Sequence, residues 1–228
     1  MNLQTKIPLK PQPSNQIDYD AKMLLLGSCF VENIGQKLDY YKFRNLQNPF
    51  GILFHPLAIG NFISNAVTRK VYKEDDVFFH NEQWHSFEAH SILSNVSKEA
   101  LLSKLNEQIE ITHEQIVKAS HIIITLGTAW VYRDIESNTV VANCHKIPQK
   151  KFLKQLLSVT DILKSLQVSL QQIKSVNQSA DIIFTVSPIR HLKDGFIENT
   201  RSKAHLITAI HEFLNHQSSI VKRQSFYF

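Results

Sequence analysis

Residues 23–30 read Met-Leu-Leu-Leu-Gly-Ser-Cys-Phe, and this stretch decides the fold. Its apolar residues run directly into Gly27 and Ser28, and a helical pattern begins immediately afterwards. We interpret the stretch as a buried strand, a tight glycine turn and the start of a helix. At such a corner a serine hydroxyl is presented at the end of a parallel sheet. Backbone N–H groups and the positive end of the next helix lie close to it.

Two roles fit Ser28 at this corner. A serine in such a turn serves as a nucleophile beside half of an oxyanion hole. Serine is also a favoured N-cap residue, so Ser28 could do no more than cap the helix that follows. The stretch by itself favours the cap. Cys29 is a variant nucleophile, because a thiol at a helix N-terminus tends to have a lowered pKa.

Apolar runs like the first one recur twice and predict two further buried strands, at 121–126 and 181–186. Apolar residues at helical spacing predict helices at 29–41, 57–67, 98–118, 161–176 and 201–221. Thr160 is the expected N-cap of the fourth helix. Alternating strands and helices predict an α/β protein with a doubly wound, mostly parallel sheet.

The remaining segments are expected to be less regular. Residues 1–21 read as an extended N-terminal arm, and residues 22–228 as a single α/β domain. Residues 45–56 contain turn signals and read as a loop. Residues 77–93 are rich in aromatic and histidine residues and predict a β-rich excursion, while 130–133 and 139–142 predict a hairpin.

Polar residues follow each of the three predicted strands. They are Gly27-Ser28, Gly127-Thr128 and the run Ser187 to His191. Ligands of doubly wound sheets bind outside the carboxyl ends of the strands, so these groups share one address. This coincidence shifts the balance for Ser28 from a cap toward a catalytic serine.

Composition narrows the function classes. The chain has 228 residues and a formal charge of +5, with 25 basic and 20 acidic residues that are mostly scattered. No aromatic ladder accompanies the basic residues, so we expect no nucleic-acid partner. Two cysteines without metal-type spacing, and His85 and His90 without framing ligands, give no reason to expect a metal. No apolar run is long enough for a membrane span, and we expect a cytoplasmic protein.

Several motifs, taken in order, resemble the GSCFA domain family, which is named for a Gly-Ser-Cys-Phe-Ala motif. Residues 27–30 carry its first four letters, and Val31 stands at the fifth position. Blocks similar to the family continue over most of the chain from Met23 onward: Asn48–Gly51, His55-Pro56, Trp84–Ser91, Thr125–Tyr132, Asn143–Lys146 and Ser187–His191.

The family is grouped with the SGNH, or GDSL-like, hydrolases. The resemblance therefore implies a flavodoxin-like three-layer fold and an esterase without a cofactor, acting on a small-molecule or carbohydrate ester such as an acetyl ester. By resemblance Ser28 is the nucleophile, and the N–H groups of Ser28 and Gly51 hold the oxyanion. Gly127 and Thr128 stand where relatives carry Gly-x-Asn, so Asn48 or Asn143 is the expected replacement for the missing asparagine.

The wider hydrolase group takes its catalytic base from a late Asp-x-x-His motif. This chain contains none, so the resemblance implies a chain shortened at its C-terminus. Within the chain we expect His191 as the base, because it follows the end of a predicted strand, with Asp194 orienting it. His145 is the second choice. A loop histidine that only binds a backbone carbonyl is the alternative for His191.

Two other interpretations stay open. The chain could be a non-catalytic binding module that keeps the pocket of a hydrolase fold without a complete triad. It could also be a fragment whose unpaired sheet edge favours self-association, because an exposed strand edge is a sticky surface.

Overall fold

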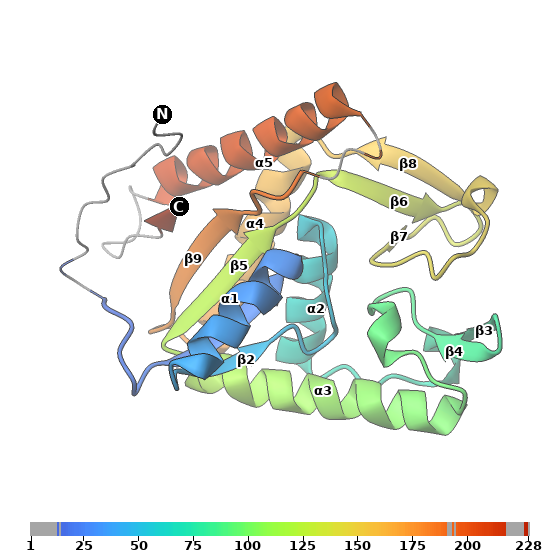
Figure 1. Ribbon diagram of the computed structural model, residues 1–228, viewed down its shortest axis with the longest axis horizontal. Coiled ribbons are helices and arrows are strands. Elements are labelled where there is room, and N and C mark those ends of the chain that lie inside the picture. Colours follow the sequence, from blue (N-terminus) through green and yellow to red (C-terminus); the bar gives the residue numbers. More distant parts are fainter. Residues whose placement is uncertain (1–12, 14, 191–192, 194, 218–225, 228) are drawn as a thin grey trace, which may run out of the picture.

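The structure is a computed structural model that describes residues 13, 15–190, 193, 195–217 and 226–227. Its centre is a parallel sheet with the strand order β10-β9-β5-β1-β2 (Figure 1). The elements of this sheet and the helices that join them are β1 (Lys22–Gly27), α1 (Cys29–Tyr40), β2 (Arg44–Gln47), α2 (Pro56–Thr68), α3 (Lys98–Lys118), β5 (His121–Leu126), α4 (Val159–Val176), β9 (Asp181–Val186), α5 (Phe196–Gln217) and β10 (Phe226–Tyr227).

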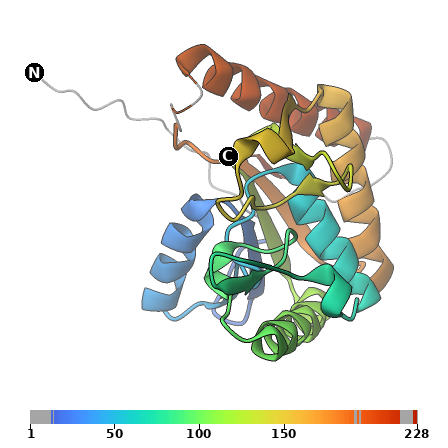
Figure 2. The ribbon, with the colours of Figure 1, turned by 90° about the vertical axis from the view of Figure 1, so that its right-hand side faces the viewer.

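Two small antiparallel sheets are inserted between these elements. One pairs β3 (Phe78–His80) with β4 (Gln83–His85), and the other places β6 (Trp130–Asp134) between β7 (Val140–Val141) and β8 (Phe152–Leu156). Short 3₁₀ turns lie at Glu74–Asp76, Ser91–Leu93 and Gln149–Lys151. Both small sheets lie on the right in Figure 1 and come to the front in Figure 2.

The order of the parallel strands makes the sheet doubly wound. From β1 the chain first moves to β2 on one side, and it later returns to β5 on the other side of β1. The direction of winding therefore reverses between β1 and β5, which is where ligands bind in such sheets. Gly27, the last residue of β1, is in register with Thr125 of β5 at this point.

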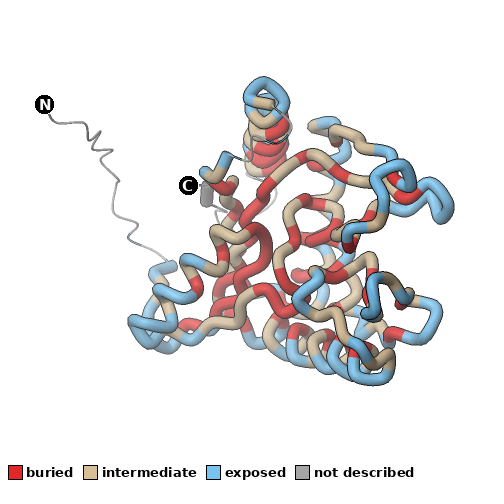
Figure 3. The backbone as a smooth tube through the Cα atoms, turned by 45° about the vertical axis from the view of Figure 1, so that its right-hand side comes forward, coloured by how far each residue is buried: buried red, intermediate tan, exposed pale blue. Residues whose placement is uncertain are grey.

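The two faces of the sheet are packed by different helices. Met23 and Leu25 face α1 and form a small cluster with Val31, whereas Leu24 and Leu26 belong to the main core. That main core also contains the buried faces of α2, α3, α4 and α5. Figure 1 shows α1 in front of the sheet with α4 behind it, and Figure 3 shows buried residues concentrated along the strands. Alternating residues of β1 thus serve opposite layers, as a strand buried on both faces requires.

The α/β class, the parallel sheet and its three buried strands are confirmed. The loop predicted over 45–56 is corrected at its start, where residues 45–47 belong to the edge strand β2. β8 was not predicted either, and it completes the hairpin of β6 and β7 as a third strand. Thr160 is not the cap of α4. Ser158 Oγ accepts the Asp161 N–H, and the Asp161 carboxylate accepts the Ser158 N–H, which together form a capping box.

Most of the predicted N-terminal arm, residues 1–12 and 14, lies outside the described part of the chain. Helix α5 begins at Phe196, five residues before the predicted start at Arg201. Among the helices that the structure describes, none combines the length and apolarity needed to cross a membrane.

Candidate functional site

The turn between β1 and α1 requires a glycine. Gly27 has φ of +137°, and a Cβ added there would lie 2.1 Å from the backbone oxygen of Thr125. The turn is tied to its neighbours on both sides, because the Ser28 N–H donates to Thr125 O (3.1 Å) and the Leu53 N–H donates to Gly27 O (3.1 Å). Only a residue without a side chain lets β1 approach β5 this closely and turn at once into a helix.

Ser28 occupies the N-cap position of α1, yet its hydroxyl does not cap the helix. Its backbone is extended, as an N-cap requires, but the side chain makes no capping hydrogen bond. Ser28 is 1% exposed, and its Oγ is buried without a hydrogen-bond partner. An unpaired buried hydroxyl costs about 1–3 kcal/mol, so its presence calls for an explanation other than helix stability.

A second unpaired polar group lies beside the same turn. The side-chain Oδ1 of Asn48 accepts the Gly27 N–H at 2.9 Å, which fixes the orientation of the amide because an N–H can only donate. The other amide atom, Asn48 Nδ2, is buried and has no partner. Asn48 is itself held by its N–H to Leu25 O (2.9 Å). An unused N–H donor is therefore anchored next to the residue that precedes Ser28.

The backbone donors expected for an oxyanion hole are already in use. The Ser28 N–H is bound to Thr125 O, and the Gly51 N–H donates to Asn48 O at 2.7 Å. The N–H groups of Gly127 and Thr128 both donate to Phe54 O. The expectation that Ser28 and Gly51 supply free N–H groups is therefore not met in this arrangement. The first turn of α1 offers two others, the N–H groups of Cys29 and Phe30, because helix geometry leaves them without helical acceptors. The Val31 N–H already donates to Ser28 O at 2.9 Å.

Gly127, at the end of β5, packs directly against the serine. A Cβ added to Gly127 would lie 3.2 Å from Ser28 Cβ and 3.1 Å from the Phe54 ring. Thr128 follows it, but the Thr128 hydroxyl pairs with Ser202 Oγ (3.1 Å) and accepts the Trp130 N–H. Of these two predicted site residues, Gly127 thus shapes the space beside Ser28, whereas Thr128 ties β5 to α5.

Lys203 of α5 reaches this end of the sheet and was not among the predicted site residues. Its Nζ donates to Gly127 O (2.6 Å) and to Ser187 O (2.8 Å), the first residues after β5 and β9. Burial lowers the pKa of Lys203 to about 8, while the nearby Cys29 acts in the opposite direction. A signal was present in the sequence, since Lys203 shares helical spacing with Leu206 and Ile210 and so lies on the apolar side of α5.

The predicted histidine bases are not brought to Ser28 by described contacts. His191 and its predicted partner Asp194 lie outside the described residues. His145 is buried against the His85 ring, and its Nε2 contacts Ser86 O at 2.8 Å. Burial lowers the pKa of His145 to about 4, so the ring is neutral. Asn143 accepts the backbone N–H of His145 with its Oδ1. Asn143 therefore lies next to the contact between His145 and residues 77–93, and no described contact brings it to Ser28.

His55 is buried at the start of α2 and has a structural role. Its Nδ1 accepts the Ala58 N–H at 3.1 Å and caps the helix, which leaves Nε2 as the donor to Val141 O (3.1 Å). Burial lowers the pKa of His55 to about 4. The neutral ring joins α2 to β7, on the side of the molecule where the small sheets lie.

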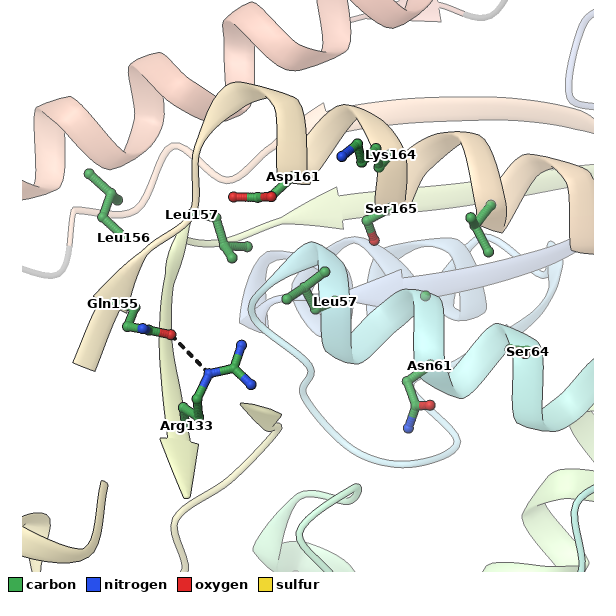
Figure 4. Close-up of a pocket in the computed structure, with 12 residues that line it drawn as sticks. Leu57, Asn61, Ser64, Arg133, Gln155, Leu156, Leu157, Asp161, Lys164 and Ser165 are labelled. Carbon is green, nitrogen blue, oxygen red and sulfur yellow. Dashed lines mark hydrogen bonds between the residues drawn. The ribbon is translucent and has the colours of Figure 1, made fainter. Parts of the chain in front are cut away.

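A groove of about 700 Å³ lies elsewhere, and Ser28 does not line it. It runs between α2, the β6–β8 sheet and the start of α4, and on its sheet side Arg133 Nε donates to Gln155 Oε1 at 3.1 Å (Figure 4). Within the described residues, no group of three or more histidine, cysteine or acidic side chains is arranged to hold a metal ion.

Comparison with curated proteins and with solved structures gives no match. Comparison with protein families gives one, the GSCFA family, over residues 22–228. The match begins at β1 and includes the Gly27-Ser28 turn, the Asn48 turn and the ends of β5 and β9. Because it covers most of the sequence, the chain belongs to the GSCFA family.

Proposed function

We propose that this chain is an ester hydrolase of the SGNH type, with Ser28 as its nucleophile. The observation that carries the proposal is the Ser28 hydroxyl, which is buried at the switch point of a parallel sheet and bonded to nothing. A structural serine at an N-cap uses its oxygen to bind the helix, and this one does not. Its oxygen is left for a reaction partner.

The reaction begins when Ser28 Oγ forms a bond to the carbonyl carbon of the ester, while its proton passes to a base. The carbonyl oxygen becomes an oxyanion, and donors aimed at that oxygen lower the barrier. Asn48 Nδ2 supplies such a donor, since it is buried, unpaired and fixed beside Gly27. The N–H groups of Cys29 and Phe30 and the positive end of helix α1 add to it. The alcohol then leaves, and water releases the acid from the serine.

Access is a distinctive property of this site. Ser28 is 1% exposed, so the segments that bury it must move aside before an ester can reach it. The proposed substrate class is an acyl or acetyl ester, including acylated carbohydrates, because a small acyl group needs the smallest opening.

Hydrolysis of p-nitrophenyl acetate and of acetylated saccharides tests the proposal. We expect slow turnover by the wild type and its complete loss in Ser28→Ala. Ser120→Ala is the matched control, because Ser120 lies at the opposite, amino end of β5 and should not affect turnover. Equal turnover by the wild type and Ser28→Ala would contradict the proposal.

A non-catalytic binding module is the second candidate function. It is favoured by one observation, namely that the N–H groups of Ser28, Gly51, Gly127 and Thr128 already donate to backbone carbonyls. This candidate predicts that an acylated saccharide binds with the same affinity to the wild type and to Ser28→Ala, without turnover by either.

A further inference from the structure

We propose that Lys203 is the general base that accepts the proton of the Ser28 hydroxyl, so that the site works as a serine–lysine pair. The inference rests on the function proposed above, and it names the residue that performs the proton transfer in it.

The position of Lys203 follows from two strand ends. Its Nζ lies between Gly127 O and Ser187 O, at 2.6 and 2.8 Å, and so at the carboxyl edge of β5 and β9. Gly127 is also the residue that packs against Ser28, at 3.2 Å from Ser28 Cβ to a Cβ placed on the glycine. Gly127 thus accepts a hydrogen bond from the amine with its oxygen and lies beside Ser28. Ser28 Oγ has no hydrogen-bond partner, so the amine and the hydroxyl are neighbours that are not bonded to each other in this arrangement. Cys29, the neighbour of Ser28, lies near enough to Lys203 to act on the pKa of the lysine, which it raises.

The two carbonyls determine what the amine can do. An amine nitrogen has four positions, and in Lys203 one is the Cε and two are N–H groups bound to carbonyls. A single position remains, which holds a third proton in the ammonium form and a lone pair in the neutral form. Lys203 can therefore gain or lose one proton without releasing either strand end, which is what a general base requires of its anchorage.

The surroundings favour the neutral form. Within the described residues, Lys203 forms no ion pair with a carboxylate. Cys29 on α1 is the titratable group that acts on it, while β5 and β9 offer it backbone carbonyls. Burial lowers the pKa of Lys203 to about 8, near the operating range of an efficient base. About a tenth of the amine is then neutral at pH 7, which is enough to support the reaction.

The proton balance of the step is simple. The O–H bond of Ser28 breaks, its proton moves to the lone pair of Lys203 Nζ, and Oγ bonds to the ester carbonyl carbon. The resulting ammonium returns this proton to the departing alkoxide, which leaves as the alcohol. In the second half, water gives a proton to the neutral amine as it attacks the acyl group, and the ammonium gives that proton back to Ser28 Oγ.

The chain contains a matched control for the structural part of this role. Lys174 of α4 also donates from Nζ to two backbone carbonyls, Gln178 O (2.9 Å) and Ala180 O (2.7 Å). Ala180 immediately precedes β9, so these two hydrogen bonds of Lys174 lie at the amino end of the sheet. Both of these carbonyls lie in the loop between α4 and β9. If Lys203 only holds backbone carbonyls as Lys174 does, replacing either lysine should change stability and leave the pH dependence of Ser28 labelling unchanged.

The test is the rate at which a fluorophosphonate labels Ser28, measured against pH. The wild-type rate should rise with a midpoint near 8, the pKa of Lys203. Lys203→Met should lower the rate about 10²- to 10⁴-fold and remove that midpoint. Lys203→Arg keeps a cation but cannot lose its proton, so it should be equally slow. Lys174→Met should keep the wild-type rate and midpoint, whatever it does to the melting temperature.

The outcomes that overturn the inference differ from those that overturn the function. If Ser28 is labelled and Lys203→Met or Lys203→Arg reacts as the wild type does, Lys203 is not the base and Ser28 remains the nucleophile. A wild-type midpoint near that of histidine, lost in His191→Ala, assigns the base to His191 instead. If Ser28 is not labelled at any pH, the proposed function fails and the base fails with it. The wild-type profile needs no variant, so a variant that does not fold leaves the test intact.

Discussion

The two ends of the central sheet use the same residue types in opposite ways. At the amino end, Asn177 is fully bonded: its Nδ2 donates to Ile116 O and Ala119 O, and its Oδ1 accepts the N–H groups of Ser179 and Ala180. At the carboxyl end, Asn48 uses only its Oδ1, and its Nδ2 is buried without a partner.

The serines repeat the contrast. Ser120, at the amino end, accepts the Lys22 N–H (3.1 Å) and donates to Lys22 O (3.2 Å), so it joins β1 to the start of β5. Ser28, at the carboxyl end, is buried and its hydroxyl is bonded to nothing. Unpaired buried polar groups are rare and destabilising, so two of them beside one turn, Ser28 Oγ and Asn48 Nδ2, support the proposed site at this end of the sheet. Single unpaired atoms also occur elsewhere, on Asn45, Gln47, His80 and His145.

The largest expected effect comes from removing the turn on which the carboxyl end is built. Gly27→Ala places a Cβ 2.1 Å from Thr125 O in a backbone conformation that other residues rarely adopt. We expect a loss of about 4 kcal/mol or more in the free energy of unfolding, or no folded protein. Gly60→Ala is the control, because its Cβ would meet the hydroxyls of Ser169 and Ser165 at 3.0 and 3.1 Å and no backbone atom closer than 3.9 Å. It should change stability by less than about 1 kcal/mol. Urea denaturation measures both.

Acid should weaken the molecule on the side of the small sheets first. The pKa values of His55 and His145 are lowered to about 4 by burial, below the ordinary value of 6.5. Between pH 6.5 and about 4 these two histidines are protonated in the unfolded chain but neutral in the folded chain. The free energy of unfolding therefore falls as the pH drops through this range. Each histidine accounts for a loss of at most about 3 kcal/mol. Hydrogen exchange should show early opening around residues 55–58 and 143–147; uniform opening across the sheet would contradict this.

Replacing Asn177 should mainly lower stability, whereas replacing Asn48 should mainly slow the labelling of Ser28. Asn177→Ala leaves two buried carbonyls and two N–H groups unpaired, so it should cost about 2–3 kcal/mol in unfolding free energy and leave the labelling of Ser28 unchanged. Asn48→Ala removes one bond and should cost about 1 kcal/mol. Its effect on labelling should be larger, about 10²- to 10³-fold, because it removes the proposed oxyanion donor. Equal effects on labelling would remove Asn48 from the site.

The smallest expected effect is on the free energy of unfolding, which should fall in Ser120→Ala but not in Ser28→Ala. Ser120→Ala removes the hydrogen-bond contacts of Ser120 Oγ with Lys22 and with His121 Nδ1, and it should lower the unfolding free energy by about 1 kcal/mol. Ser28→Ala removes an oxygen that has no partner, so stability should stay within about 0.5 kcal/mol or rise. Thermal unfolding compares the pair. A clear loss of stability in Ser28→Ala would show that the hydroxyl is bonded after all.

The buried strands of the fold could be predicted from the sequence because they coincide with runs of apolar residues. Strands β1, β5 and β9 are such runs, and helix α3 follows the apolar spacing at both of its ends. Strand β2 escaped prediction because Arg44–Gln47 is a half-exposed edge strand without an apolar run, and only its pairing with β1 makes it a strand.

The location of the candidate site could be predicted from the sequence, but the contacts within the site could not. The Gly27-Ser28 turn and Asn48 are local signals, and the structure places them together. Whether the Gly51 N–H is free depends on the turn that closes it onto Asn48 O, and the reach of Lys203 depends on how α5 crosses two strand ends. Both contacts depend on how distant segments pack in the tertiary structure, and the spacing of motifs in the sequence does not determine that packing.

The central claim is that the carboxyl end of the sheet is a reactive site with Ser28 as its nucleophile. Treating the folded wild-type protein with a fluorophosphonate, followed by peptide mapping in a mass spectrometer, tests it most directly. We predict one adduct per chain, located on Ser28 and absent from Ser28→Ala, with Ser120 unmodified. No adduct on the folded protein, or an adduct that persists in Ser28→Ala, would contradict the claim.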